Sequence, residues 1–443
     1  MCPEVVSVGN VTDTDPTVRF AGLRRYSRVA RGALADTRPL RTPAYRRLWT
    51  AGIVTVIGAQ LTVVAVPTQI FAMTGSSAYV GLTGLFGLVP LVVFGLWGGA
   101  IADAMDRRTL LLITGAGIAA MSLALWVIAA SGVGGVWLVL VLFAVQSALL
   151  AMNQPARSAV IPRLVTPALL PAANTLNFTV MTFGAVVGPL LAGVLIPVIG
   201  LSTLYLIDAV ALLATLWATW RLPAMPPAGD QRGRAGLAEV VAGFRYAAMH
   251  KVLLVSFLAD IVAMAFGMPR ILFPEMAERT FGDPPGGGLA LGLLFAAIPA
   301  GTVIGGLFSG WLSRVRRQGV AVTVSICVWG LGVALFGLTQ TLWVAVLLLA
   351  IAGAGDLVSA VFRSSMLQTV ATDEMRGRMQ GVFTVVVAGG PRVADLWHGA
   401  VAPFTGPGLA ATVGGFAVIV GVVVVVIRFR EFWRYRAPVA PVT

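Results

Sequence analysis

The chain has 443 residues, of which 58% are hydrophobic and only 11% are charged. Soluble domains carry about 25% charged residues, so the composition excludes an ordinary soluble protein and indicates a membrane protein. The formal net charge of +13 does not indicate a nucleic-acid binder, because the basic residues cluster in short polar gaps between long apolar runs. Two cysteines, Cys2 and Cys327, exclude a disulfide framework, and no Cys/His spacing predicts a metal site.

Residues 1–45 are polar, rich in arginine and without a hydrophobic period, which predicts a flexible cytoplasmic tail. Twelve apolar runs follow, each close to the ~20 residues that cross a bilayer. No signal peptide is expected, since the first long run begins only near Gly52. The twelve runs start near Gly52, Tyr79, Thr109, Val136, Leu169, Leu201, Val252, Leu289, Val320, Leu342, Met379 and Leu409.

The gap from Arg221 to Lys251 is the only long internal loop, and its part from Leu237 to Met249 is predicted to form a surface helix. The predicted fold class is therefore an all-α membrane protein with two six-helix halves. The halves are expected at 46–221 and 252–430, joined by a cytoplasmic linker at 222–251 and followed by a cytoplasmic tail at 431–443.

Arginines occupy alternate gaps between the apolar runs, and cytoplasmic loops carry such an excess of basic residues. Both termini and the linker are therefore predicted to face the cytoplasm, with the protein in the inner membrane. On the opposite side only the loop around Glu278, Arg279 and Asp283 is charged. The arginine-bearing gaps are the N-terminal region, 107–108, 157–163, 221–251, 314–317, 376–378 and the C-terminal region.

An internal repeat supports two related halves. Aligning Arg157 with Arg363 also aligns Gly184 with Gly390 at the same offset. Parallel repeats of this kind are typical of transporters built from two halves related by a pseudo-two-fold axis.

The turn after the second run reads GAIADAMDRR from Gly99 to Arg108. This resembles the loop signature of the major facilitator superfamily. The resemblance implies that an Asp–Arg cluster latches the two halves in the outward-facing state; the alternative is a charged turn that only sets topology. The residues of this predicted latch are Gly99, Asp103, Asp106, Arg107 and Arg108.

The fifth run reads GAVVGPLLAG from Gly184 to Gly193 and resembles the antiporter pattern of the same superfamily. Small residues four apart leave a flat helix face for close packing, and Pro189 bends the helix. Gly184, Gly188, Pro189 and Gly193 could seal the path between the halves, or could simply pack helices together.

Three further stretches narrow the resemblance to the enterobactin-exporter branch and its relatives, the transmembrane secretion effectors. They are NQPAR from Asn153, the segment from Asp260 to Pro274, and DEMRGR from Asp373. The resemblance implies twelve helices, alternating access and proton-coupled efflux, but it does not fix the substrate.

Ionisable residues at membrane depth are costly and indicate function. Asp260 lies about two turns into the seventh run, while Arg392, Asp395 and His398 follow one another at spacings of three in the eleventh. These four are the candidates for proton coupling, with Asp260 and Asp395 as proton carriers and Arg392 tuning Asp395. The alternative is that Arg392 and Asp395 neutralise each other and only fix the helix.

Four other residues are candidate substrate or gate residues: Arg157, Arg363, Arg270 and Asp356. Arg157 and Arg363 are expected at the cytoplasmic edge, where holding loops is the alternative role. Asp208 in the sixth run is expected to make a structural polar contact.

The sequence thus predicts a secondary transporter that exports small amphiphilic, siderophore-like or drug-like molecules by proton antiport. The expected partners are the substrate and the lipid bilayer, with no nucleic acid and with a functional monomer. No cofactor, metal or catalytic residue is expected, because the proton gradient supplies the energy. An importer or facilitator on the same fold is the first alternative. An intramembrane enzyme is the second, although the chain has no HExxH, GxSxG or P-loop motif.

Overall fold

The structure is a computed structural model that describes residues 36–226 and 237–436, so most of the predicted N-terminal tail lies outside it. The described residues form helices joined by short turns. The first half consists of α2 (Pro43–Thr74), α3 (Ser77–Ala104), α4 (Arg107–Ser131), α5 (Val136–Leu164), α6 (Leu170–Ile199) and α7 (Leu201–Trp220). The second consists of α9 (Lys251–Gly267), η3 (Arg270–Leu272), α10 (Phe273–Arg279), α11 (Leu289–Leu307), α12 (Gln318–Leu338), α13 (Leu342–Val370), α14 (Asp373–Thr405) and α15 (Pro407–Arg428). Five shorter helices are η1 (Arg38–Arg41), η2 (Pro167–Leu169), α8 (Leu237–Met249), η4 (Ser309–Arg314) and α16 (Arg430–Trp433).

Eleven segments within the described ranges are long and apolar enough to cross a membrane. The exception among the long helices is α14, which has 33 residues and carries Arg392, Asp395 and His398. It packs against α3, α9 and α15 inside the bundle, so it completes a set of twelve spans. The predicted all-α membrane fold is confirmed.

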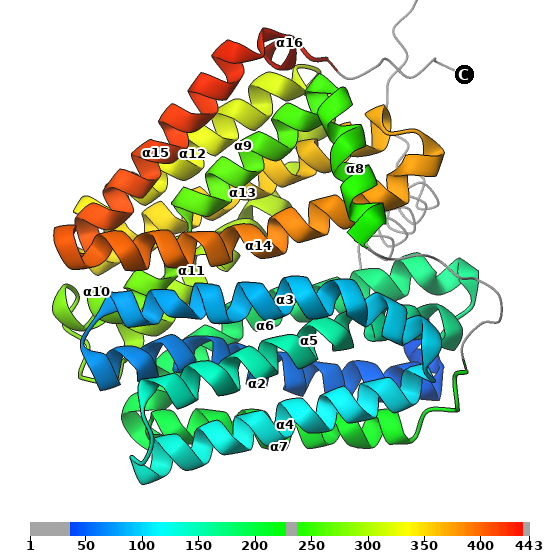
Figure 1. Cartoon of the computed structure of the whole chain (residues 1–443), viewed down its shortest axis with the longest axis vertical. Helices are drawn as coiled ribbons and strands as arrows, with labels where there is room; N and C mark the ends of the chain where they lie inside the picture. Colours follow the sequence, from blue (N-terminus) through cyan, green and yellow to red (C-terminus); the bar gives the residue numbers. More distant parts are fainter. Residues whose placement is uncertain (1–35, 227–236, 437–443) are drawn as a thin grey trace, which may run out of the picture.

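The two halves lie side by side and meet along two pairs of helices (Figure 1). Helix α3 packs against α14, and α6 packs against α11. The contacts are closest at the end of the bundle that carries the α2–α3 turn and α10, called the turn end below. There a Cβ on Gly81 would lie 2.6 Å from the Cα of Gly399, and one on Gly193 would lie 2.8 Å from the Cα of Gly292. Only glycine allows the backbones to approach so closely.

The close contact between α3 and α14 does not continue along the whole of α3. Gly84 and Gly87 still face Arg392 of α14, whereas no described atom lies within 4 Å of a Cβ placed on Gly95. The halves are therefore packed together at the turn end and separate along α3 toward the other end.

The seventh span is interrupted between α9 and α10. Met268 leaves the helix with φ −107° and ψ 88°, as expected for a residue that precedes a proline. The following residue, Pro269, has no backbone N–H to continue the helix, and a short turn, η3, redirects the chain. The break presents Arg270 to α14, where it meets Asp395.

The borders of the halves differ from those predicted by a few residues. Helix α2 begins at Pro43, and the buried hydroxyl of Tyr45 donates to the carbonyl of Ala173 at 2.9 Å. Leu222 and Met225 pack against the first half rather than belonging to a free linker. Helix α8 has the bounds predicted for the surface helix, Leu237–Met249, and packs against α9 and α14.

Candidate functional site

Two clusters of charged side chains lie inside the second half. The first joins Asp260 of α9 to Arg363 of α13 by a buried ion pair. Asp356, about two turns before Arg363 on α13, approaches the same guanidinium at 3.9 Å. Arg363 also donates to the hydroxyl of Ser359 at 3.1 Å, and its guanidinium stands 5.9 Å from the ring centre of Phe383.

The three groups of this first cluster differ in exposure. Arg363 is 4% exposed and Asp260 1%, whereas Asp356 is 33% exposed. Two carboxyl groups share one arginine, so the cluster carries one negative charge when all three groups are ionised.

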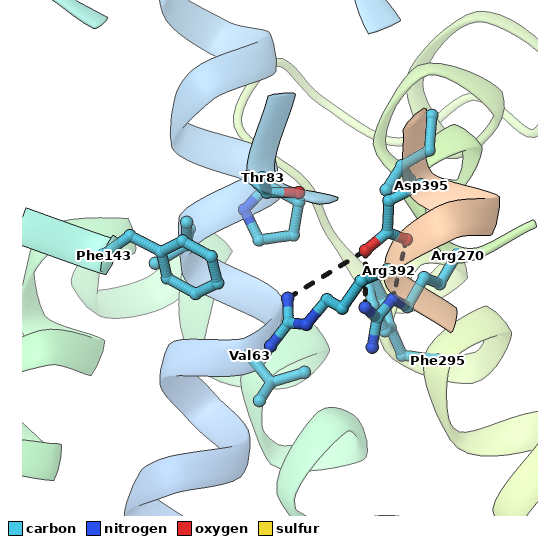
Figure 2. A pocket seen from close by; sticks show the side chains of 10 residues that line it. Val63, Thr83, Phe143, Arg270, Phe295, Arg392 and Asp395 are labelled. Carbon is cyan, nitrogen blue, oxygen red and sulfur yellow. Dashed lines mark hydrogen bonds and ion pairs between the residues drawn. The ribbon is translucent and has the colours of Figure 1, made fainter. Parts of the chain in front are cut away.

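The second cluster joins Asp395 of α14 to two arginines (Figure 2). Arg270 donates from Nε to Oδ1 at 2.9 Å and from Nη2 to Oδ2 at 2.5 Å, which is a two-pronged pairing. Arg392 lies further away, with 3.9 Å between its Nη1 and Oδ2 of Asp395. Sequence spacing predicted that Asp395 pairs with Arg392. Its closer partner is Arg270, which is far from Asp395 in the sequence and is placed beside it by the interrupted seventh span.

A small cavity of about 60 Å³ adjoins this second cluster and lies between the halves. The first half contributes side chains from α2, α3 and α5, and the second contributes the charged cluster and neighbouring apolar residues. The lining residues are Val63, Val66, Pro67, Thr83, Phe143, Arg270, Ile271, Phe295, Arg392 and Asp395.

His398 does not join the charged cluster. Its side chain is fully buried, and Nδ1 donates to the carbonyl of Ala394 at 2.9 Å. Nε2 has no hydrogen-bond partner among the described residues and points toward Gly414 of α15, whose Cβ position would lie 2.9 Å away. His398 thus belongs to the α14–α15 packing, and its predicted part in proton coupling has no contact with Asp395 to support it.

The described part of the predicted latch ties the α3–α4 turn to its own half. Asp106 caps α4 by accepting from the backbone N–H of Thr109 at 2.9 Å, and it accepts from Met225 at 2.6 Å. Arg107 donates to the carbonyl of Ala159, and Arg108 donates to that of Trp220. Burial alone would raise the pKa of Asp106, but these donors outweigh it and hold the pKa below the ordinary value. The surroundings of Gly99 and the side chain of Asp103 lie outside the described part of the structure.

The four small residues of α6 pack in two directions. Side chains added to Gly184 and Gly188 would collide with Val56 and Gln60 of α2 in the same half. Pro189 and Gly193 instead face α11 of the other half, where a Cβ on Gly292 would lie 2.7 Å from the carbonyl oxygen of Pro189. Part of the predicted motif therefore lies at the contact between the halves.

Arg157 and Arg363 occupy aligned positions of the repeat but have different surroundings. Arg157 of α5 lies against α2, with its Nη2 2.9 Å from a Cβ placed on Gly52. Arg363 is buried in an ion pair with Asp260, so the expectation that it lies at the edge and holds a loop is wrong. The residue of the first half that aligns with Asp260 is Val54, so Arg157 has no carboxylate at the position where Arg363 has one.

A contact between the halves at the turn end was not predicted. The hydroxyl of Ser77 donates to the buried carboxylate of Glu275, which also pairs with Arg279 at 2.5 Å. Arg279 in turn donates to the carbonyl of Gly75 at 3.0 Å and stands 5.4 Å from the ring centre of Phe71. The sequence feature that could have indicated this contact is the charge of the loop around Glu278, Arg279 and Asp283, which is the only charged loop on its side of the membrane.

Asp208 forms a separate polar network within the first half. Its Oδ2 accepts from the hydroxyls of Thr62 at 2.8 Å and Ser122 at 2.7 Å, and Gln146 donates to Ser122. The network joins α2, α4, α5 and α7, as expected for a structural polar contact.

Comparison with known proteins gives the family. The profile of the family described as transmembrane secretion effector matches residues 34–434. An enterobactin exporter of Citrobacter koseri is 28% identical over 414 residues, covering 89% of this chain and 94% of the relative. An enterobactin exporter of Escherichia coli O81 is 29% identical over 419 residues, covering 90% and 95%.

Solved structures agree on the fold. A bacterial homolog of the human lysosomal transporter Spinster, inward-facing and unoccupied, matches with a TM-score of 0.67 at 16% identity, covering 90% of this chain and 97% of that one. The nucleoside transporter NupG matches with a TM-score of 0.70 at 15% identity, covering 88% and 99%. The chain therefore belongs to the transmembrane secretion effector family and is a transporter of the major facilitator superfamily.

Proposed function

We propose that this transporter exports small amphiphilic molecules, siderophore-like or drug-like, in exchange for protons. The observation that carries the proposal is the buried cluster of Asp260, Asp356 and Arg363. An unpaired charge at membrane depth costs roughly 2.5–3.5 kcal/mol on insertion scales, so a proton on one carboxyl removes that cost. Asp356 is the most exposed group of the cluster and is the carboxyl group through which the proton would enter and leave.

The geometry favours Asp260 and Asp356 over Asp395 as the proton site. Two arginines lie within 4 Å of Asp395 and more than balance its charge, whereas Asp260 and Asp356 share a single arginine. Asp395 instead lines the cavity between the halves. Relatives that are named as enterobactin exporters support the outward direction of transport and a small organic substrate.

The contacts between the halves support a mechanism of alternating access. With the arginine-rich loops in the cytoplasm, the turn end faces outward and is closed, so the arrangement corresponds to an inward-facing state. Opening of the turn end would separate Ser77 from Glu275 and Gly193 from Gly292. The loop signature around Asp106 and Arg107 contacts only its own half among the described residues, as a latch of the outward-facing state would.

The experiment is transport in inside-out vesicles that contain the protein, with an imposed proton gradient and a panel of siderophores, macrolides and dyes. Gradient-dependent accumulation that a protonophore abolishes is expected for at least one compound. Entry that ignores the protonophore and stops at equal concentrations inside and outside would make the protein a facilitator, and uptake only into right-side-out vesicles would make it an importer. Vesicles that lack the protein provide the background.

The proposed orientation predicts which loops can be labelled from outside the cell. In a chain with Cys2 and Cys327 replaced by Ser, the exposed positions Pro285→Cys and Arg316→Cys lie in loops on opposite sides. An impermeant maleimide is expected to label Pro285→Cys in intact cells and Arg316→Cys only after permeabilisation. The reverse pattern would invert the topology, and labelling of both in intact cells would refute it.

A further inference from the structure

The cavity between the halves is lined by more positive than negative side chains. Arginine stays protonated in proteins, so Arg270 and Arg392 contribute two positive charges. Asp395 is the one carboxylate among the ten residues that line the cavity. With the carboxylate ionised, this side of the cavity therefore carries one positive charge that its own residues do not balance.

Arg392 is the arginine that remains available to a ligand. The fork of Arg270 already occupies both oxygens of Asp395, at 2.9 and 2.5 Å. The guanidinium of Arg392 lies 3.9 Å from Oδ2, beyond hydrogen-bond distance, and 5.2 Å from the ring centre of Phe143. It is 23% exposed, and Figure 2 shows it lying between Asp395 and Phe143.

The other walls fix the kind of anion that would fit. Val63 and Pro67 of α2, Phe143 of α5 and Phe295 of α11 present apolar surface from both halves. The cavity of about 60 Å³ can hold one small group, whereas a complete drug-sized ligand needs a pocket of roughly 300–1,000 Å³. A charged head can enter it while an apolar body stays against the aromatic wall.

We propose that the substrates are organic anions, and that a carboxylate beside an aromatic or apolar body binds between Arg392 and Phe143. The inference rests on the proposed transport function and specifies the charge of its substrate. Binding of the anion supplies the missing negative charge and joins α14 of one half to α5 of the other.

A matched pair of probes tests the charge directly. Naphthoate and naphthamide share one ring system and differ by a carboxylate against a neutral amide. Binding to the purified full-length protein in nanodiscs is measured by titration calorimetry. Naphthoate is expected to bind at least about tenfold more tightly, because a hydrogen bond to a charged group contributes that much or more. Equal affinities, a preference for the amide, or no binding of either probe would overturn the proposal.

Variants assign the preference to Arg392. Arg392→Gln is expected to abolish the preference for naphthoate, and Arg392→Lys to retain part of it because the charge is kept. Arg316→Gln removes an equal charge from an exposed loop and is expected to leave the preference unchanged. A preference that survives in Arg392→Gln with native abundance would place the anion elsewhere and overturn the assignment. Because binding is measured without a gradient, a failure of proton-driven export would leave this result standing, and the converse also holds.

Discussion

Replacing Asp260 by Asn is expected to abolish proton-driven export. The change leaves Arg363 buried with its main partner gone, since Asp356 is 3.9 Å away and one-third exposed. Breaking a buried ion pair by removing one partner costs about 3–5 kcal/mol, so the abundance of the variant in the membrane should also fall. The measurement is gradient-driven accumulation in inside-out vesicles, normalised to the amount of transporter.

A double variant separates the proton-carrying role from a purely structural pair. Asp260→Asn with Arg363→Gln removes both charges of the buried pair and leaves Asp356, which is one-third exposed, as a single carboxyl group, so abundance is expected to recover while proton-driven export stays absent. Asp208→Asn is the matched control, because Asp208 is also a buried carboxyl group but has hydroxyl partners and no ion pair among the described residues. Restored proton-driven export in the double variant would show that the cluster only holds α9 to α13.

Replacing Gly193 by Val is expected to eliminate transport by preventing closure of the turn end. A Cβ at this position would lie 2.8 Å from both the Cα of Gly292 and the carbonyl oxygen of Gly288, and backbone atoms cannot move aside. The protein should therefore remain open at the turn end. In a chain without its native cysteines, Ser77→Cys reports the state, because Ser77 is 2% exposed when the halves meet.

Labelling of Ser77→Cys by an impermeant maleimide in intact cells should be slow in the parent chain and fast after Gly193→Val. Gly95→Val is the matched control, since no described atom lies within 4 Å of a Cβ there, and it is expected to keep both transport and slow labelling. Equal labelling with and without Gly193→Val would mean that α6 and α11 do not control the turn end.

The sequence predicted the spans well because bilayer thickness imposes a simple requirement on length and apolarity. Helix α14 is not among the spans recognised by length and composition in the described residues, and it begins at Asp373, six residues before the predicted start near Met379. The surface helix Leu237–Met249 was predicted with the correct bounds. Local patterns of this kind need no knowledge of distant contacts.

The pairing of charges could not be predicted in the same way. The spacing of Arg392, Asp395 and His398 suggested one row, but each step of three residues turns about 60° around a helix of 3.6 residues per turn. Arg392 and Asp395 consequently meet the cavity, whereas His398 points toward α15. The partner of Asp395 comes from an interrupted span 125 residues away, and no local pattern encodes that contact.

The charges of α14 also bear on how the protein is made. A helix with Arg392 and Asp395 at membrane depth inserts poorly by itself, because each charge costs roughly 2.5–3.5 kcal/mol at the centre of the bilayer. Arg270, the closest partner of Asp395, belongs to a span that the ribosome completes four spans earlier. The seventh span has therefore already been synthesised when α14 emerges from the ribosome. Synthesis of the chain from its N-terminus delivers the two partners in the order that insertion requires.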